Sequence, residues 1–80
     1  MKALDTALDR ALDTALIAAH EADAHETLVD LYMRAAARAG DIDTACFHLT
    51  HAYIFALELG DARAVDLRDQ LVAHGRETND

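Results

Sequence analysis

The chain has 80 residues, with 7 Lys and Arg against 15 Asp and Glu, and a formal net charge of −8. A chain of this length forms one domain, which we assign to residues 1–80. Phosphate backbones and anionic membranes attract clustered cations, so the charge argues against nucleic acid and against a membrane as partners. Hydrophobic residues make up 52% of the chain, which is a globular and not a disordered composition.

Cysteine content and the amino-terminal pattern bear on the cellular compartment. Cys46 is the only cysteine, so no disulfide can form within one chain. Asp5, Asp9 and Asp13 interrupt the first turns, which is typical of an amphipathic helix and not of a signal peptide. We therefore predict a cytoplasmic protein. Because small domains often gain stability from a second subunit, we also expect a homo-oligomer.

The low glycine and proline content of the sequence favours helices. Proline is absent and only three glycines occur, so the usual turn signals of all-β folds are missing. We predict an all-α domain of three to four antiparallel helices, arranged as helical hairpins or a small bundle. The helices are expected at about residues 3–20, 24–39, 42–59 and 62–74. Short connections between them imply antiparallel neighbours.

The first predicted helix carries a leucine at every fourth residue, which forms one ridge along a helix. These leucines are Leu4, Leu8, Leu12 and Leu16. The chain then turns polar, and Asp23 with Glu26 has the spacing of a capping box that would start a second helix. Neither glycine nor proline enforces the break, so one long bent helix over 3–39 is an alternative. We favour the break.

Glycines and aspartates mark the later boundaries. Gly40 offers a helix stop, and Asp41 or Asp43 offers the next amino-terminal cap. Gly60 repeats this punctuation, and Gly75 ends the last predicted helix. Stop and start signals that lie so close together again indicate short loops.

The third predicted helix, 42–59, is apolar over most of its circumference. Besides its main apolar face, a second apolar strip holds Phe47, Ile54 and Leu57, and Phe55 falls in a narrow polar lane. A helix with so much apolar surface must be covered on more than one side. In so small a chain we expect the other helices to leave part of it uncovered.

A Gly-Asp turn followed by a small, a large apolar and a small residue begins at Gly40. These residues are Gly40, Asp41, Ala45, Leu49 and Ala52. The pattern resembles the turn and second helix of the tetratricopeptide repeat, an antiparallel helix pair used for protein binding. The resemblance covers about residues 28–72 and implies a scaffold that presents a surface.

Two further segments are similar to the first helix of the same repeat, namely Leu28 with Leu31-Tyr32, and Leu49 with Ala52-Tyr53. The chain also departs from the family. Tetratricopeptide repeats are about 34 residues long, whereas here Gly-Asp turns follow both the second and the third predicted helix, and the proline that usually ends a repeat is missing.

Histidines raise the question of a metal. His48 and His51 lie three residues apart and share a helix face. The segment from His20 to Glu26 offers further donors for a site of Zn²⁺ or iron between helices. The Glu-x-x-His motif of such sites is absent, so we assign no metal and no other cofactor. A small helical metal-binding protein that uses His48 and His51 is kept as the alternative.

Catalytic patterns are missing. Cys46 lies on an apolar face, where a buried thiol is inert, and no phosphate-binding glycine loop occurs. We therefore predict that the chain is not an enzyme. Phe55 stands between His51 and Glu58, and exposed aromatics among polar residues are common interface anchors.

The functional prediction is a protein-interaction module. It docks a partner, or a second copy of itself, through Phe47, Ile54 and Phe55 on the third helix. A chaperone for a basic client would rest on the acidic charge alone.

Overall fold

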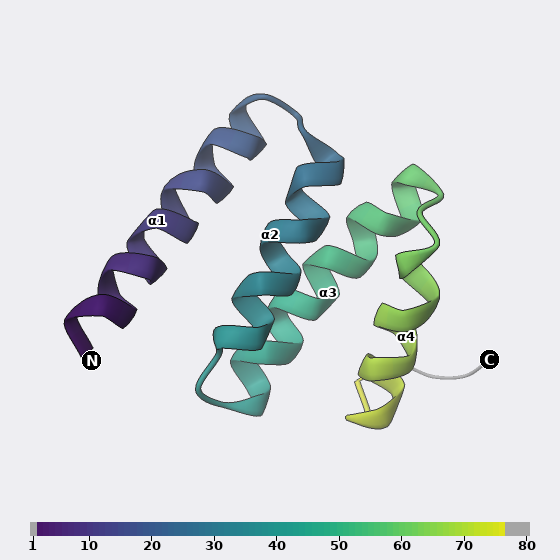
Figure 1. Ribbon diagram of the computed structural model, residues 1–80. Helices are drawn as coiled ribbons and strands as arrows, with labels where there is room; N and C mark the ends of the chain where they lie inside the picture. The colour runs from purple at the N-terminus through teal and green to yellow at the C-terminus, as the bar shows by residue number, and fades with distance from the viewer. Residues whose placement is uncertain (1, 77–80) are drawn as a thin grey trace.

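The computed structural model describes residues 2–76, with side chains from residue 7 onward. This part of the chain forms α1 (Lys2–Glu21), α2 (His25–Arg38), α3 (Ile42–Leu59) and α4 (Arg63–Ala73) (Figure 1). The predicted all-α class is confirmed, with the helices packed on one another as a small bundle. α1 and α2 are separate helices, as the favoured interpretation of the polar stretch expected.

The helices form a thin layer in which each packs on its neighbour along the chain. α2 and α3 share the most extensive contact, α4 packs on α3, and α1 packs on α2. The Cα atoms extend over 42 × 29 × 14 Å. Since a helix with its side chains is about 10–12 Å across, the short dimension leaves little room for a covering layer. Apolar side chains on the broad faces therefore face solvent.

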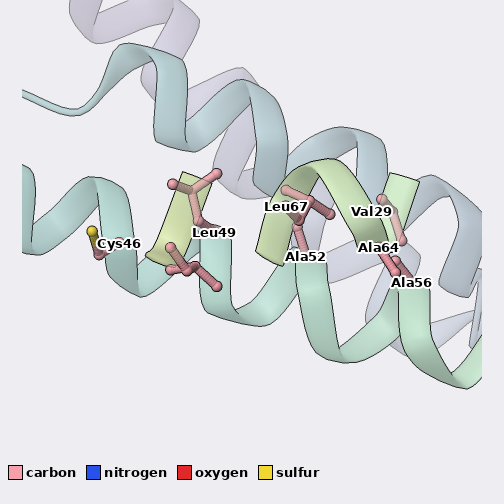
Figure 2. Packing of buried hydrophobic residues seen from close by; sticks show 8 residues of the cluster. Val29, Cys46, Leu49, Ala52, Ala56, Ala64 and Leu67 are labelled. Carbon is pink, nitrogen blue, oxygen red and sulfur yellow. The ribbon is translucent and has the colours of Figure 1, made fainter. Parts of the chain in front are cut away.

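The main core lies where α2, α3 and α4 meet (Figure 2). Ala52 and Ala56 of α3 are fully buried, and their small side chains let the neighbouring helices approach closely. Leu67 and Leu71 of α4 close the core from the other side. The buried members of this cluster are Val29, Cys46, Leu49, Ala52, Ala56, Ala64, Leu67 and Leu71.

A second, smaller core joins α1 to α2. Its buried members are Ala19, Leu28 and Leu31, and the half-buried Leu12 and Leu16 pack against them. Leu12 and Leu16 of the predicted leucine ridge thus face α2, Leu8 is exposed, and Leu4 lies outside the residues whose side chains are described. The two helices diverge from their connecting loop toward their other ends (Figure 1).

Two glycines end helices as predicted, and one does not. Gly60 (φ 66°) and Gly75 (φ 72°) adopt the left-handed conformation that follows a helix. The next N–H then reaches back to the last turn, from Asp61 to the Ala56 carbonyl at 2.9 Å and from Arg76 to the Leu71 carbonyl at 2.8 Å. Gly40 is not left-handed; instead α2 ends because Ala39 is extended.

Asp41 caps α3, one of the two predicted alternatives. Its carboxylate accepts a hydrogen bond from the Thr44 backbone N–H at 2.8 Å and another from the Thr44 hydroxyl at 3.0 Å. These hydrogen bonds favour the ionised form and lower the pKa of Asp41. The cap fixes the start of α3 at Ile42.

The predicted capping box at Asp23 is wrong. Asp23 has φ 52° and ends α1: its N–H donates to the His20 carbonyl at 3.2 Å, and the Ala24 N–H donates to the Ala19 carbonyl at 2.9 Å. These hydrogen bonds are those of a helix terminus with a left-handed residue, where glycine is usual. Ala24 precedes α2 and makes no side-chain cap. Asp23 is tolerated because aspartate adopts this conformation more readily than most residues.

Replacement of Asp23 tests this assignment. Asp23→Gly is expected to raise the free energy of unfolding by about 0.5–1 kcal/mol, because glycine adopts positive φ without steric cost. Asp23→Ala, the matched control, is expected to lower it, because alanine lacks the local hydrogen bonding that helps aspartate there. Urea unfolding followed by circular dichroism measures both. An Asp23→Gly chain no more stable than Asp23→Ala would contradict the left-handed terminus.

Candidate protein-interaction surface

α3 has one buried side and one open side. Its buried residues are Cys46, Leu49, Ala52 and Ala56. On the other side Phe47, Ile54 and Leu57 are 59%, 47% and 54% exposed. Spacings of seven and three residues place these three side chains on one ridge of the helix. We call Phe47, Ile54 and Leu57 the α3 strip.

The α3 strip is exposed because of how the layer is built. α2 and α4 are the two helices whose backbones approach α3. They occupy its buried side, and within residues 2–76 no other helix packs over the remaining side. Single exposed apolar residues are ordinary, but several large ones on one helix face are characteristic of interaction sites.

Carboxylates bound the α3 strip at both ends. Asp43 lies one turn before Phe47; its side chain is 84% exposed and accepts a hydrogen bond from Arg76. Glu58 follows Leu57; its side chain is 56% exposed and lies 3.9 Å from Nδ1 of His25. The strip therefore presents an apolar centre with polar ends: the Asp43–Arg76 ion pair lies at one end and the Glu58 carboxylate at the other.

A shallow hollow adjoins the strip beside Phe47. It has a volume of about 550 Å³ and is lined by Asp43, Cys46, Phe47, Thr50, His51 and Arg76. Cys46 lies at the buried side of this hollow, since it is only 2% exposed. The hollow extends the surface that a docked partner can contact.

Phe55 is less exposed than its polar neighbours in the sequence predict, whereas its part in docking stays a prediction. It is half-buried and packs against both cores. Its ring lies 5.8 Å from that of His20 and 5.2 Å from that of His25, centroid to centroid. The loop between α1 and α2 brings these histidines over the polar lane. Leu57 follows Ile54 by three residues in the predicted second strip. Its side chain is more exposed than that of Phe55.

Histidines and aromatic rings form a layer where α1, α2 and α3 meet. Tyr32 is at its centre: its hydroxyl is 2.8 Å from Nε2 of His20, and its ring stacks on His51 at 4.9 Å. The Phe55 ring also stacks on the Tyr32 ring, with the two centroids 6.1 Å apart. Partial burial raises the pKa of Tyr32. This layer is the side-chain connection between α1 and α3, whose backbones do not approach each other.

His48 is the unsatisfied member of this layer. Its Nδ1 is buried without a hydrogen-bond partner. Burial lowers the pKa of His48, the neighbouring His51 lowers it further, and Asp13 of α1 acts in the opposite direction. Protonation would add a buried N–H without an acceptor, so the folded state favours neutral His48.

The pH dependence of stability follows from His48. Because its folded pKa lies below the ordinary value of 6.5, the unfolded chain binds this proton more readily. The contribution of His48 is therefore complete above pH 6.5 and is lost as the pH falls through the folded pKa. Urea unfolding is expected to show a free energy of unfolding that falls between pH 7.5 and 5. His48→Gln should make this fall smaller. The exposed His74, replaced in the same way, is the control; an equal change in both variants would contradict the assignment.

The metal alternative is not supported by the geometry. Among the described residues, no three His, Cys, Asp or Glu side chains lie close enough together to hold a metal ion. His48 has its Nδ1 buried, and Nδ1 of His51 donates to the Phe47 carbonyl at 2.9 Å. His20, from the predicted donor segment, contacts Tyr32 instead. The histidines thus pack as rings of the aromatic layer.

Comparisons with protein-family models, with curated proteins and with solved structures find no match for the chain. Within the described residues, no helix has the length and apolar character needed to cross a membrane. We therefore infer a function from the surface of this chain itself.

Proposed function

We propose that the chain is a protein-interaction module that docks another protein chain through the α3 strip and has no catalytic role. The observation that carries the proposal is the exposure of Phe47, Ile54 and Leu57 at 59%, 47% and 54% on one ridge. Fully burying a large apolar side chain contributes about 1.5–3 kcal/mol. Covering three half-exposed ones therefore favours docking by several kcal/mol before the cost of association is subtracted.

The packing of the chain supports the same class of function. Each helix packs on its neighbours along the sequence, as in helical-repeat proteins, which present extended surfaces to partners. The tetratricopeptide-like pattern over 28–72 agrees with this proposal. A partner of matching chemistry offers an apolar groove with a cation at the margin that meets Glu58, because Asp43 is already paired with Arg76.

Site-specific crosslinking tests the proposal. A photoreactive phenylalanine analogue is placed at Phe47, or at Ile17 as control, and the chain is irradiated in an extract of its source cells. Ile17 is a suitable control because it is 62% exposed and lies on α1, whose backbone does not approach α3. Adducts are expected from position 47 and not from position 17.

Competition shows whether the adducts depend on the strip. Excess unlabelled wild-type chain should suppress adducts with proteins other than this chain, whereas excess Ile54→Asp/Leu57→Asp should not, because two carboxylates cannot be buried in an apolar contact without large cost. Adducts that are equally abundant at both positions, or equally suppressed by both competitors, would overturn the proposed function.

A further inference from the structure

A groove runs between α1 and α2 on the side that faces away from α3. It has a volume of about 260 Å³, and all of its lining residues belong to α1 and α2. These are Leu8, Ala11, Leu12, Ala15, Leu31, Arg34 and Arg38. A second hollow along the same helix pair includes Thr44 and His48 of α3. That hollow lies on the α3 side, so the groove opens on the opposite face.

The groove exists because the α1–α2 core is incomplete. The two helices diverge away from their loop (Figure 1). Ala19 and Leu28, near the loop, are buried, whereas Leu8 at the far end of α1 remains 46% exposed. Leucines thus face each other across a space that no side chain of the described residues fills. A ridge of apolar side chains from another helix would complete this core.

The charged residues that line the groove are arginines, so they favour a bound segment that carries carboxylates. Its lining contains two charged residues, Arg34 and Arg38, both on the α2 wall. Nε of Arg38 already donates to Asp9 at 2.8 Å, and Arg34 is exposed at the margin. Because Arg38 is already balanced by Asp9, Arg34 supplies the cationic margin of this apolar groove, in a chain with a net charge of −8. Complementary potentials favour an apolar ridge with carboxylates beside it.

We propose that the α1–α2 groove binds the α3 strip of a second copy of this chain. The proposal rests on the proposed function, for which it names the partner. The strip supplies the required chemistry: an apolar ridge with the exposed carboxylate of Glu58 at its carboxyl-terminal end. The groove cannot accept the strip of its own chain, because it opens away from α3.

The dimensions define the contact. The α1 wall from Leu8 to Ala15 is about 10 Å long, at 1.5 Å per residue. The α3 strip from Phe47 to Leu57 is about 15 Å long by the same measure. Ile54 and Leu57 lie about 4.5 Å apart along the helix axis, so both fit within the groove. The proposed contact places Glu58 against Arg34 and leaves Phe47 at the mouth.

Such a contact is head-to-tail. Groove and strip are different patches, so each bound copy still offers one free groove and one free strip, and association continues into longer assemblies. A symmetric strip-to-strip dimer would instead stop at two copies. The two arrangements respond differently to mixtures of damaged chains.

Sedimentation of two variants and their mixture tests the proposal. The groove variant is Leu8→Glu/Arg34→Glu, and the strip variant is Ile54→Asp/Leu57→Asp; all four positions are exposed in the folded chain. Wild type is expected to associate with rising concentration, and each variant alone to remain monomeric, with association weakened at least about tenfold. The equimolar mixture should form a 1:1 dimer, because one variant retains its strip and the other its groove.

Each other outcome overturns the inference. A mixture that stays monomeric shows that groove and strip do not meet. Association that the groove variant retains and the strip variant loses shows a strip-to-strip contact, which still supports the proposed function. A wild-type chain that is monomeric at millimolar concentration removes the second copy as partner, and crosslinking at position 47 then decides the proposed function separately.

Charge exchange checks the orientation of the contact. Arg34→Glu alone and Glu58→Arg alone should each weaken association about fivefold, as expected for one exposed ion pair. A chain that carries both changes should associate like wild type, since the pair is restored with opposite polarity. Additive weakening in the double variant would overturn the Glu58–Arg34 contact. Circular dichroism of every variant confirms that the helices are retained.

Discussion

Phe55→Asp should destabilise the fold by about 3 kcal/mol, whereas Phe47→Asp should change the free energy of unfolding by less than about 0.5 kcal/mol. The two positions lie on the same helix and receive the same substitution. Phe55 packs against both cores and the rings of His20 and His25. A carboxylate there would lose apolar contacts and be partly desolvated. Phe47 is 59% exposed, so a carboxylate at this position stays hydrated.

Urea unfolding of both variants, followed by circular dichroism, measures the difference. Phe47→Asp is also expected to weaken docking, measured by sedimentation, while its helicity is unchanged. Equal stability of the two variants would show that Phe55 does not join the cores. A Phe47→Asp chain that unfolds would show that the α3 strip has a structural role.

Leu67→Ala should lower the free energy of unfolding by about 3 kcal/mol, because it removes a fully buried side chain and leaves a cavity where α3 and α4 meet. A domain of this size has a total stability of roughly 4–12 kcal/mol. One deletion therefore removes a large part of the margin. The thin layer makes this loss severe, since a second core is present only between α1 and α2.

Val65→Ala is the matched control for Leu67→Ala. Val65 lies two residues earlier on the same helix and is 68% exposed, so its truncation should change stability by less than about 0.5 kcal/mol. Chemical unfolding of both chains gives the comparison. Comparable losses would contradict the placement of α4 with Leu67 inward and Val65 outward.

Local signals in the sequence predict much of this fold. Asp41 and Gly60 bracket α3 because one caps the first N–H groups and the other adopts positive φ after the last turn. Periodicity also separates the buried side of α3 from the strip of Phe47, Ile54 and Leu57. These features depend on residues within a few positions of one another, so a single sequence contains them.

The sequence does not predict the conformations of Asp23 and Gly40 or the partial burial of Phe55, because these depend on more distant structure or on close alternatives. Asp23 has the spacing of a cap, but the same residue type is also tolerated at positive φ, and here the turn selects the second role. Gly40 is dispensable as a left-handed stop because Ala39 is extended. Phe55 lies among polar neighbours in sequence, yet His20 and His25 cover it from another segment. Helical periodicity identifies a face but not the element that covers it.

The α3 strip is open in the free chain, and we propose that it is covered in the docked one. Methyl NMR with a soluble paramagnetic probe measures this for Ile54 and Leu57. In the dilute chain both should be relaxed as strongly as the exposed Ile17 and Val65, while Leu67 and Leu71 stay shielded. In the crosslinked complex Ile54 and Leu57 should become shielded, and Ile17 and Val65 should not. Methyl groups of Ile54 and Leu57 that are already shielded in the dilute chain, or still relaxed in the complex, would contradict the account.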